Sequence, residues 1–215
     1  MTSTLLPLIA LCAALTIYGE IAGRRRLVYL CKPLTTILIL LLAAALPLEP
    51  GSRYRGAVLI GLLFSLAGDV LLMLPRDLFL AGVVAFLAAH IAYLTAFTSL
   101  VPLAASPAAW AAVAVVVTVI LAALWRRLPA RLRPALAAYA AVLGAMTAQA
   151  ITQGVLVGSA AAMAGAAGGV LFLASDSALV TNRFARAFRL APLLVLGTYY
   201  AAQVLIALSS LVTIR

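Results

Sequence analysis

The sequence is poor in charged side chains, and above all in acidic ones. Only five of its 215 residues are Asp or Glu, and charged residues of both signs make up 9% of the chain. Hydrophobic residues make up 67%, and the mean hydropathy is +1.22. A soluble domain has about 25% charged residues, which it needs on its surface. The composition therefore excludes a soluble globular fold and indicates a membrane protein with several spans.

Histidine and cysteine are almost absent. The single histidine is His90, and neither Cys12 nor Cys31 has a Cys or His neighbour at the spacing of a metal site. We therefore expect no metal and no other cofactor, and interpret both cysteines as small apolar fillers. The chain carries a net charge of +10, but its basic residues lie in short loops between apolar segments. Basic side chains there orient helices and meet anionic lipids, so nucleic-acid binding is not expected.

Eight apolar segments are long enough to cross a bilayer, which takes about 20 residues each. Backbone polar groups in lipid must be satisfied within the segment, and the alternation of a barrel strand is absent, so these spans are predicted to be helices. Proline and glycine punctuate the turns, with Gly154 and Gly158 expected to mark the sixth one. The sequence predicts an all-α transmembrane bundle that forms one integral membrane domain over residues 1–215. The expected spans are 4–22, 29–48, 56–74, 78–100, 107–125, 134–152, 159–180 and 190–213.

The basic residues predict how the bundle is oriented. Twelve of the 15 lie in or beside the loops after the first, third, fifth and seventh spans, and only three lie on the opposite side. By the positive-inside rule, these loops face the cytoplasm and both termini lie outside. The 14 arginines against one lysine, with abundant Ala and Leu, suggest a bacterial gene of high GC content. We therefore expect a multi-pass protein of the bacterial inner membrane.

Two of the five acids, Asp69 and Asp176, lie well inside predicted spans. Asp69 and Asp176 are each about six residues from the cytoplasmic end of their helix, which places both about 9 Å inside at 1.5 Å per residue. An Asp at the centre of a membrane helix costs about 2.5–3.5 kcal/mol, so such a residue is a candidate functional site. Both could instead be structural, bonded to neighbouring helices or paired with Lys32. We expect them to form a site that opens toward the cytoplasm.

Other polar side chains are predicted near this layer. Glu20 and Lys32 should lie slightly closer to the cytoplasm, where they could also simply form an ion pair. His90 could orient water or an Asp, or be a packing residue. Deeper side chains that could line the same cavity, or only pack between helices, are Tyr93, Tyr199, Tyr200 and Gln203.

The two aspartates lie in similar segments that are 107 residues apart. The same shift aligns Leu66 with Leu173 and Tyr93 with Tyr200. This pattern is what a duplication of four helices would produce, with parallel pseudo-repeats of about 1–106 and 107–215. Such a repeat would bring both aspartates near a common axis.

Several segments resemble the YhhN family of membrane proteins. These are KPLTT (32–36), GLLFSLAGDVLLMLP (61–75), FLAAHIAYLTAF (86–97), LFLASDSALVTNRF (171–184) and LVLGTYYAAQVLI (194–206). The resemblance covers nearly the whole chain in the expected order. Because characterised members are lysoplasmalogenases, it implies hydrolysis of the vinyl ether of a lysoplasmalogen to a fatty aldehyde and a glycerophospho-alcohol.

Vinyl ether hydrolysis needs an acid that protonates the outer alkene carbon and a group that offsets the resulting positive charge. Two neighbouring carboxyl groups can divide these tasks. We predict Asp176 as the acid, Asp69 as the carboxylate and His90 as an assisting group. Lys32 and Arg183 are expected to hold the phosphate. The full predicted substrate-binding set is Glu20, Lys32, Tyr93, Asn182, Arg183, Tyr199, Tyr200 and Gln203.

Two other functions remain open at the level of sequence. The same Asp pair could carry protons in a proton-coupled transporter or serve a lipid-binding membrane protein. The chain could also be a purely structural membrane subunit. In the enzymatic interpretation, the partners are a lysophospholipid substrate and the surrounding membrane lipids.

Overall fold

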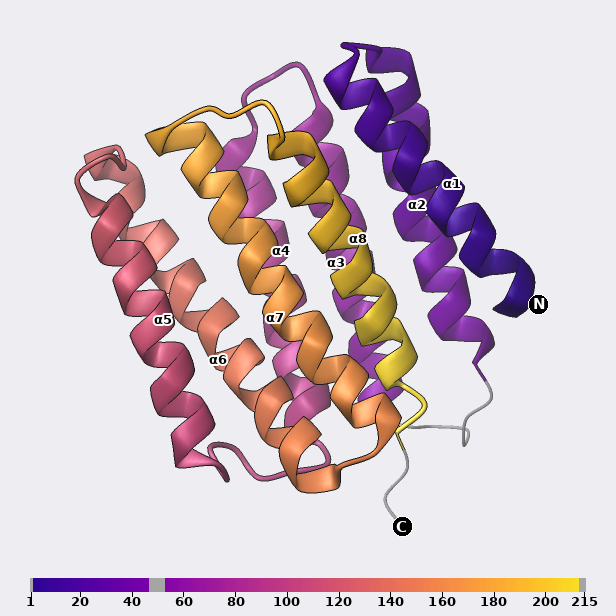
Figure 1. Cartoon of the computed structure of the whole chain (residues 1–215), viewed down its shortest axis with the longest axis vertical. Helices are drawn as coiled ribbons and strands as arrows, with labels where there is room; N and C mark the ends of the chain where they lie inside the picture. Colours follow the sequence, from indigo (N-terminus) through magenta and orange to yellow (C-terminus); the bar gives the residue numbers. More distant parts are fainter. Residues whose placement is uncertain (1, 47–52, 213–215) are drawn as a thin grey trace.

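The computed structural model describes residues 2–46 and 53–212 of the chain, and the described part is built from eight long helices joined by short loops (Figure 1). All eight are long and apolar enough to cross a membrane, which confirms the expected all-α transmembrane fold. The helices are α1 (Thr2–Ile21), α2 (Arg25–Ala45), α3 (Arg53–Met73), α4 (Phe79–Thr98), α5 (Pro107–Trp125), α6 (Arg133–Val157), α7 (Ala160–Val180) and α8 (Ala191–Ser209). A 3₁₀ turn (Ala130–Leu132) precedes α6, and a π-helical turn (Thr181–Ala185) extends α7.

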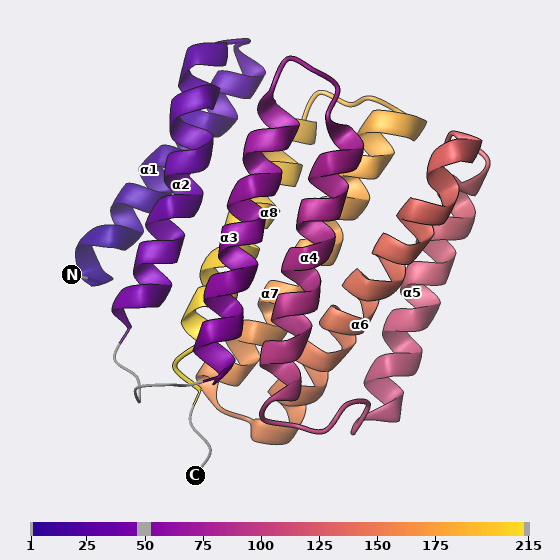
Figure 2. The same ribbon diagram turned by 180° about the vertical axis from the view of Figure 1, so that it is seen from behind.

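The helices alternate in direction, so every second loop lies at the same end of the bundle (Figures 1 and 2). The loops after α1, α3, α5 and α7 share the upper end in Figure 1. These are the arginine-rich loops of the sequence analysis. The clustering of positive charge at one end is the arrangement that the positive-inside rule requires.

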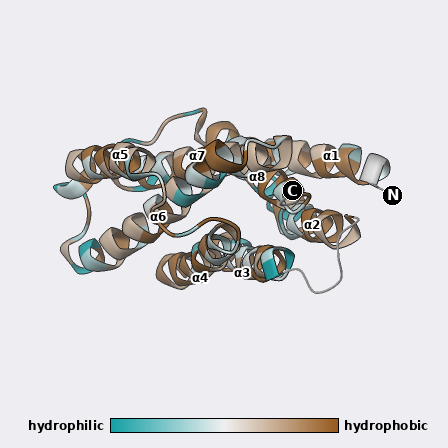
Figure 3. Cartoon of the chain, turned by 90° about the horizontal axis from the view of Figure 1, so that it is seen from below, coloured by the Kyte–Doolittle hydropathy of each residue, from teal (hydrophilic) through white to brown (hydrophobic). Residues whose placement is uncertain are grey.

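Viewed along the helices, the bundle is elongated (Figure 3). Helices α1 and α2 form one end, and α5 and α6 form the other. The pairs α3–α4 and α7–α8 lie between them and make the most extensive contacts. Across the centre, α2 contacts α8 and α6 contacts α4, which joins the two halves of the chain.

Polarity is distributed as expected for a protein surrounded by lipid. Asp69, His90 and Gln203 are almost completely buried, whereas Leu30 and Val115 are more than 60% exposed. Polar groups have no water to bond with in a bilayer core, so they must find partners inside the protein. The interior of this bundle is therefore where chemistry can take place.

Glycine lets the central helices approach closely. A Cβ atom at Gly61 in α3 would lie 2.2 Å from a ring carbon of Tyr93 in α4. Gly168 in α7 is similarly close to Ile206 in α8. Small residues at such contacts are a main device of helix packing in membranes.

The expected spans agree with the helices to within about four residues except at α6, and the expected end of the second span, at position 48, lies outside the described residues. The sequence predicted an end near residue 152 and a turn marked by both Gly154 and Gly158, but α6 continues to Val157. Gly154 lies inside the helix, where a Cβ would be 2.8 Å from that of Ala166 in α7. Gly158 alone makes the turn, with a left-handed φ of 67°. The expected last residue of the eighth span, at position 213, lies outside the described residues.

The contact at Gly61 can be tested by adding a single methyl group. Because Tyr93 is fully buried and hydrogen-bonded, its ring has no room to yield, and we expect Gly61→Ala to destabilise the protein by about 1–3 kcal/mol. Gly56→Ala in the same helix is the matched control, since no atom lies within 4 Å of its added Cβ. Thermal unfolding in detergent would measure the difference. Equal stabilities of the two variants would contradict this account of the α3–α4 contact.

Candidate active site

Asp69, in α3, is held by side chains from two other helices. Its Oδ2 accepts hydrogen bonds from the hydroxyls of Thr36 in α2 (2.6 Å) and Tyr199 in α8 (2.7 Å). The Nζ of Lys32, also in α2, lies 3.9 Å from Oδ1. Only 2% of the Asp69 side chain is exposed. Two hydroxyl donors and an ammonium group are suitable partners for an ionised carboxylate, which can only accept hydrogen bonds.

A hydrogen-bonded row of side chains continues from Asp69 into the bundle. The hydroxyl of Tyr199 accepts a bond from Nε2 of Gln203 at 3.1 Å, and Oε1 of Gln203 accepts one from Tyr93 at 2.7 Å. Tyr93 also lies 3.3 Å from the hydroxyl of Ser65. The row orients Tyr199 toward Asp69 and makes α4, α8 and α3 parts of one polar cluster. We call Lys32, Thr36, Asp69, Tyr199, Gln203 and Tyr93 the Asp69 cluster.

Asp176 lies in a different environment. Its Oδ2 accepts a hydrogen bond from the hydroxyl of Tyr139 in α6, and Nε2 of His90 in α4 is 4.0 Å away. The His90 ring is fully buried, and neither of its nitrogens has a hydrogen-bonding partner among the described residues. The Asp176 side chain is 12% exposed, compared with 2% for that of Asp69. We call Asp176, Tyr139 and His90 the Asp176 cluster.

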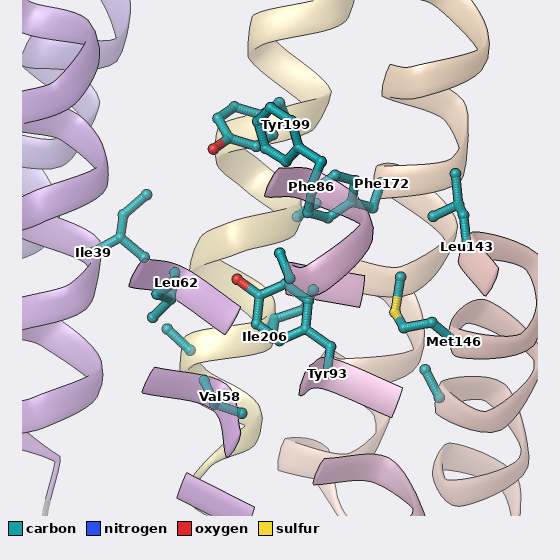
Figure 4. Close-up of a cluster of buried hydrophobic side chains, with 14 of the residues drawn as sticks. Ile39, Val58, Leu62, Phe86, Tyr93, Leu143, Met146, Phe172, Tyr199 and Ile206 are labelled. Carbon is teal, nitrogen blue, oxygen red and sulfur yellow. The ribbon is translucent and has the colours of Figure 1, made fainter. Parts of the chain in front are cut away.

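Aromatic rings lie between the two clusters. The ring of Phe172 packs 4.6 Å from that of His90 on one side and 5.5 Å from that of Tyr199 on the other. Phe86 packs edge-on against both Phe172 and Tyr199, as Figure 4 shows. The two carboxylates therefore have no partner in common in the described part of the chain. Each must be considered within its own set of contacts.

The exposed side of Asp176 faces an apolar groove between α5, α6 and α7. The groove is narrow, with a cavity volume of about 50 Å³, and its lining is apolar except for Asp176, Tyr139 and Ser177. Its apolar walls include Leu121 on α5 and Leu143 on α6. The arrangement brings Asp176 to the wall of a narrow apolar space.

The pattern of residues matches one known family. Residues 27–210 match the model of the YhhN family over most of the chain. This chain belongs to the YhhN family. The resemblance identified from the sequence is thereby confirmed.

Named relatives of this YhhN-family chain occur in mammals and bacteria. Lysoplasmalogenase TMEM86B of Sus scrofa is 37% identical over 186 residues, which cover 83% of this chain and 72% of the pig protein. Lysoplasmalogenase TMEM86A of Bos taurus is 29% identical over 184 residues, or 84% of this chain and 75% of the relative. The uncharacterized membrane protein YhhN of Escherichia coli O157:H7 is 43% identical over 68 residues, 32% of each chain. No solved structure matches the chain.

The structure brings together most of the side chains selected from the YhhN-family sequence. Lys32, Tyr93, Tyr199 and Gln203 join the Asp69 cluster, and His90 joins Asp176 as described above. Tyr200 packs beside Tyr199, with ring centroids 5.1 Å apart.

Three other selected residues lie at the arginine-rich end, outside both clusters. Glu20 is exposed and lines a separate pocket at the inner end of α1. Arg183 forms an ion pair with Asp77 at 2.8 Å. The side chain of Asn182 accepts a bond from the backbone of Phe188 and so shapes the loop before α8. No group of three or more His, Cys, Asp or Glu side chains that could hold a metal ion occurs among the described residues.

Two site residues were missed by the sequence analysis. Thr36 and Tyr139 each donate a hydrogen bond to one of the aspartates. The 107-residue shift would have identified Tyr139, because it aligns Lys32, a partner of Asp69, with Tyr139, the partner of Asp176. A repeat of four helices also matches α4 with α8. In agreement with it, a side chain of α8 contacts Asp69 and a side chain of α4 contacts Asp176. The four-plus-four repeat remains a prediction, and this agreement supports it.

The role of Thr36 can be tested with an isosteric substitution. Thr36→Val removes one of the two hydroxyl donors from a buried carboxylate, and we expect a loss of stability of about 1–3 kcal/mol. Thr152→Val is the matched control, because buried Thr152 bonds only to the carbonyl of Ala148 in its own helix. Unfolding in detergent should show the larger loss for Thr36→Val. A loss no greater than that of the control would argue against a structural role for the Thr36–Asp69 bond.

Proposed function

We propose that this chain hydrolyses the vinyl ether bond of lysoplasmalogens, giving a fatty aldehyde and glycerophosphoethanolamine or glycerophosphocholine. Two kinds of support agree. Relatives that match more than four-fifths of the chain are named lysoplasmalogenases. The observation that carries the proposal is that the partly exposed side chain of Asp176 lines an apolar groove. A lysolipid has one aliphatic chain, and its vinyl ether is located where that chain joins the polar part.

Asp176 is the acid in this proposal. Its proton passes to the outer alkene carbon, and the electrons of the double bond leave the ether carbon as an oxocarbenium ion. Water adds to that carbon and returns a proton to the Asp176 carboxylate, which leaves a neutral hemiacetal. The hemiacetal then loses its hydroxyl proton as the bond to the glycerol oxygen breaks and that oxygen is protonated. The products are an aldehyde and an alcohol, and Asp176 ends in its starting state.

The neighbours of Asp176 fit this role. Tyr139 fixes one carboxyl oxygen by donating a hydrogen bond, which leaves the other oxygen for the substrate. Neither nitrogen of His90 has a hydrogen-bonding partner among the described residues, and Nε2 lies 4.0 Å from Oδ2 of Asp176, so we assign His90 to orient the attacking water. The described protein groups within 4 Å of Asp176 include no permanent cation, so little opposes positive charge in the transition state.

Asp69 has a supporting role as the fixed carboxylate. Its two hydroxyl bonds and Lys32 keep it charged inside the bundle, and its contact with Tyr199 holds the aromatic rings that separate it from His90. A preorganised negative charge on this side of the site favours the oxocarbenium ion. Lys32 belongs to this cluster, so we assign the phosphate to the arginines instead.

The head group is placed at the arginine-rich end of the bundle, which we assign to the cytoplasmic face of a bacterial inner membrane. Arg183 and Arg131 line one surface pocket with Asp77 there, and Val180 of the apolar groove is one turn before Arg183. Seven residues separate Asp176 from Arg183, or about 10 Å along a helix. The phosphate of a bound lysolipid lies only a few bonds from the ether. An Arg183 side chain that points back toward the groove can therefore reach it across this distance.

The proposal is tested by product analysis of the purified protein. We expect it to release fatty aldehyde from a lysoplasmalogen in detergent, with identification of both products by mass spectrometry. Asp176→Asn keeps the size of the side chain but removes the acid, and activity should fall by about 10²-fold or more. Thr95→Val is a control, since Thr95 is exposed on α4 and bonds only to its own helix. Full activity of a folded Asp176→Asn variant would disprove the assigned acid.

The alternative function, proton-coupled transport, is favoured by one observation. Buried polar side chains continue beyond the Asp69 cluster, where Tyr54 bonds to Ser209 at 2.8 Å and to Gln153 at 3.2 Å. Such side chains can relay protons along a bundle. Proteoliposomes with a pH-sensitive dye inside would distinguish the two functions. Proton uptake driven by a lipid or solute gradient, without aldehyde release, would replace the enzymatic proposal with this one.

A further inference from the structure

A second groove lies between α5 and α6, the helices that form one end of the bundle (Figure 3). We call it the α5–α6 groove. Its volume is about 730 Å³, which is far larger than that of the groove beside Asp176. On α6 its lining runs from Ala137 to Ala148, a length of about 16 Å at 1.5 Å per residue. One leaflet of a bilayer core is about 15 Å deep, so the groove matches the depth of one leaflet.

The α5–α6 groove is open at the surface and has no protein group to fill it in the described part of the chain. Its α6 side carries only alanine and glycine, whereas larger side chains such as Leu121 line its α5 side. Helix α5 buries only Val113 and Leu124, and Ala141 on the α6 side of the groove is exposed. Unfilled space between helices loses dispersion contacts, so in a membrane a lipid or another protein must occupy it.

The end of the α5–α6 groove at the arginine-rich loops carries a free positive charge. Arg126 lines the groove and is exposed, and no carboxylate of the described residues forms an ion pair with it. The other arginines nearby are engaged. Arg127 donates a hydrogen bond to the carbonyl of Ala185, and Arg133 stacks over the ring of Trp125 at 5.5 Å. Tryptophan at a helix end is typical of the membrane interface, which places Arg126 at the level of the lipid phosphates.

The charges around the α5–α6 groove are all of one sign. No Asp or Glu lines it, and residues 126–133, from the end of α5 to the start of α6, include four arginines and no acid. A lipid phosphate would find a partner in Arg126, but the ammonium of a zwitterionic head group would find none and would be repelled. Charge complementarity therefore favours a lipid whose head group is negatively charged.

We propose that the α5–α6 groove binds an anionic phospholipid from the leaflet at the arginine-rich end, with an acyl chain along α6 and its phosphate on Arg126. The bound lipid holds α5 against α6. Val117, Leu121 and Ala140 line both this groove and the one beside Asp176, so the lipid also packs against a wall of the Asp176 groove. The proposal concerns binding alone and does not depend on the hydrolysis proposed above.

Thermal unfolding in mixed micelles tests the contact with the head group. We expect phosphatidylglycerol to raise the Tm by about 3–6 °C more than phosphatidylcholine does at the same mole fraction, as a ligand at about ten times its Kd would. Arg126→Gln removes the phosphate partner and should abolish most of this difference. Arg189→Gln is the matched control, because Arg189 is an exposed arginine at the same end that lines neither groove. It should keep the wild-type difference.

A pair of tryptophan variants tests where the acyl chain lies. Ala141→Trp puts a large ring into the α5–α6 groove, and we expect it to abolish the difference between the two lipids. Ala138→Trp is the control, since Ala138 is an exposed residue of α6 outside the lining, and it should keep the difference. A phosphatidylglycerol with a diazirine on its acyl chain adds a measurement on the wild-type protein. Mass spectrometry should locate the label on α5 and α6, and excess unlabelled phosphatidylglycerol should remove it.

The outcomes that contradict the site are distinct. Equal stabilisation by both lipids, an equal loss of the phosphatidylglycerol effect in Arg126→Gln and Arg189→Gln, or labelling confined to other helices would overturn it. Labelling needs no variant, so it decides the assignment even where Ala141→Trp does not fold. Light scattering covers the other possible occupant. A wild-type dimer that Ala141→Trp converts to a monomer would assign the groove to a second copy of the chain and reject the lipid.

Discussion

A carboxylate inside a bilayer must take its partners from the protein, and the bundle is organised around that requirement. Burial of an unpaired charge costs several kcal/mol, more than a typical helix contact returns. At Asp69 this cost is offset by hydrogen bonds, because the hydroxyls of Thr36 in α2 and Tyr199 in α8 both donate to Oδ2. The bond to Tyr199 connects residues 130 positions apart in the chain. It thus ties the last helix to the first half of the protein and fixes the rotation of α8, which in turn presents Gln203 to Tyr93.

The sequence predicted the parts of this structure that depend on hydropathy and spacing. Eight spans, their alternation and the matching depth of the two aspartates all follow from counting residues in apolar segments. The rotation of each helix about its own axis does not, because a membrane helix that is apolar all round carries little information about which face points inward. For this reason the selected residues Lys32 and Tyr199 proved to share one partner, while Asp69 and Asp176 acquired separate ones. The end of α6 was misjudged for a related reason, since Gly154 serves a close helix contact rather than a turn.

The two aspartates show how one arrangement can support two chemical environments. Each lies on the third helix of its half and is contacted from the preceding helix and from the last helix of the other half. At the position of the preceding helix, Lys32 supplies an ammonium to Asp69, whereas Tyr139 supplies a phenol to Asp176. The ammonium is a partner for an ionised carboxylate, and only 2% of the Asp69 side chain is exposed. The phenol orients a carboxyl group without fixing its charge, and that carboxyl is the one that reaches an open groove.

The asymmetry extends to the outer helices, and it explains why the side chain of Asp176 is more exposed than that of Asp69. Helix α1 packs against both α2 and α8, so the side of the bundle near Asp69 is closed. Helix α5 occupies the corresponding place in the second half, but its main partner is α6 alone. The space between α5 and α7 is what leaves the groove beside Asp176. The exposed part of Asp176 thus results from a difference between the halves, because α1 contacts a helix of the other half and α5 packs mainly on its own neighbour α6.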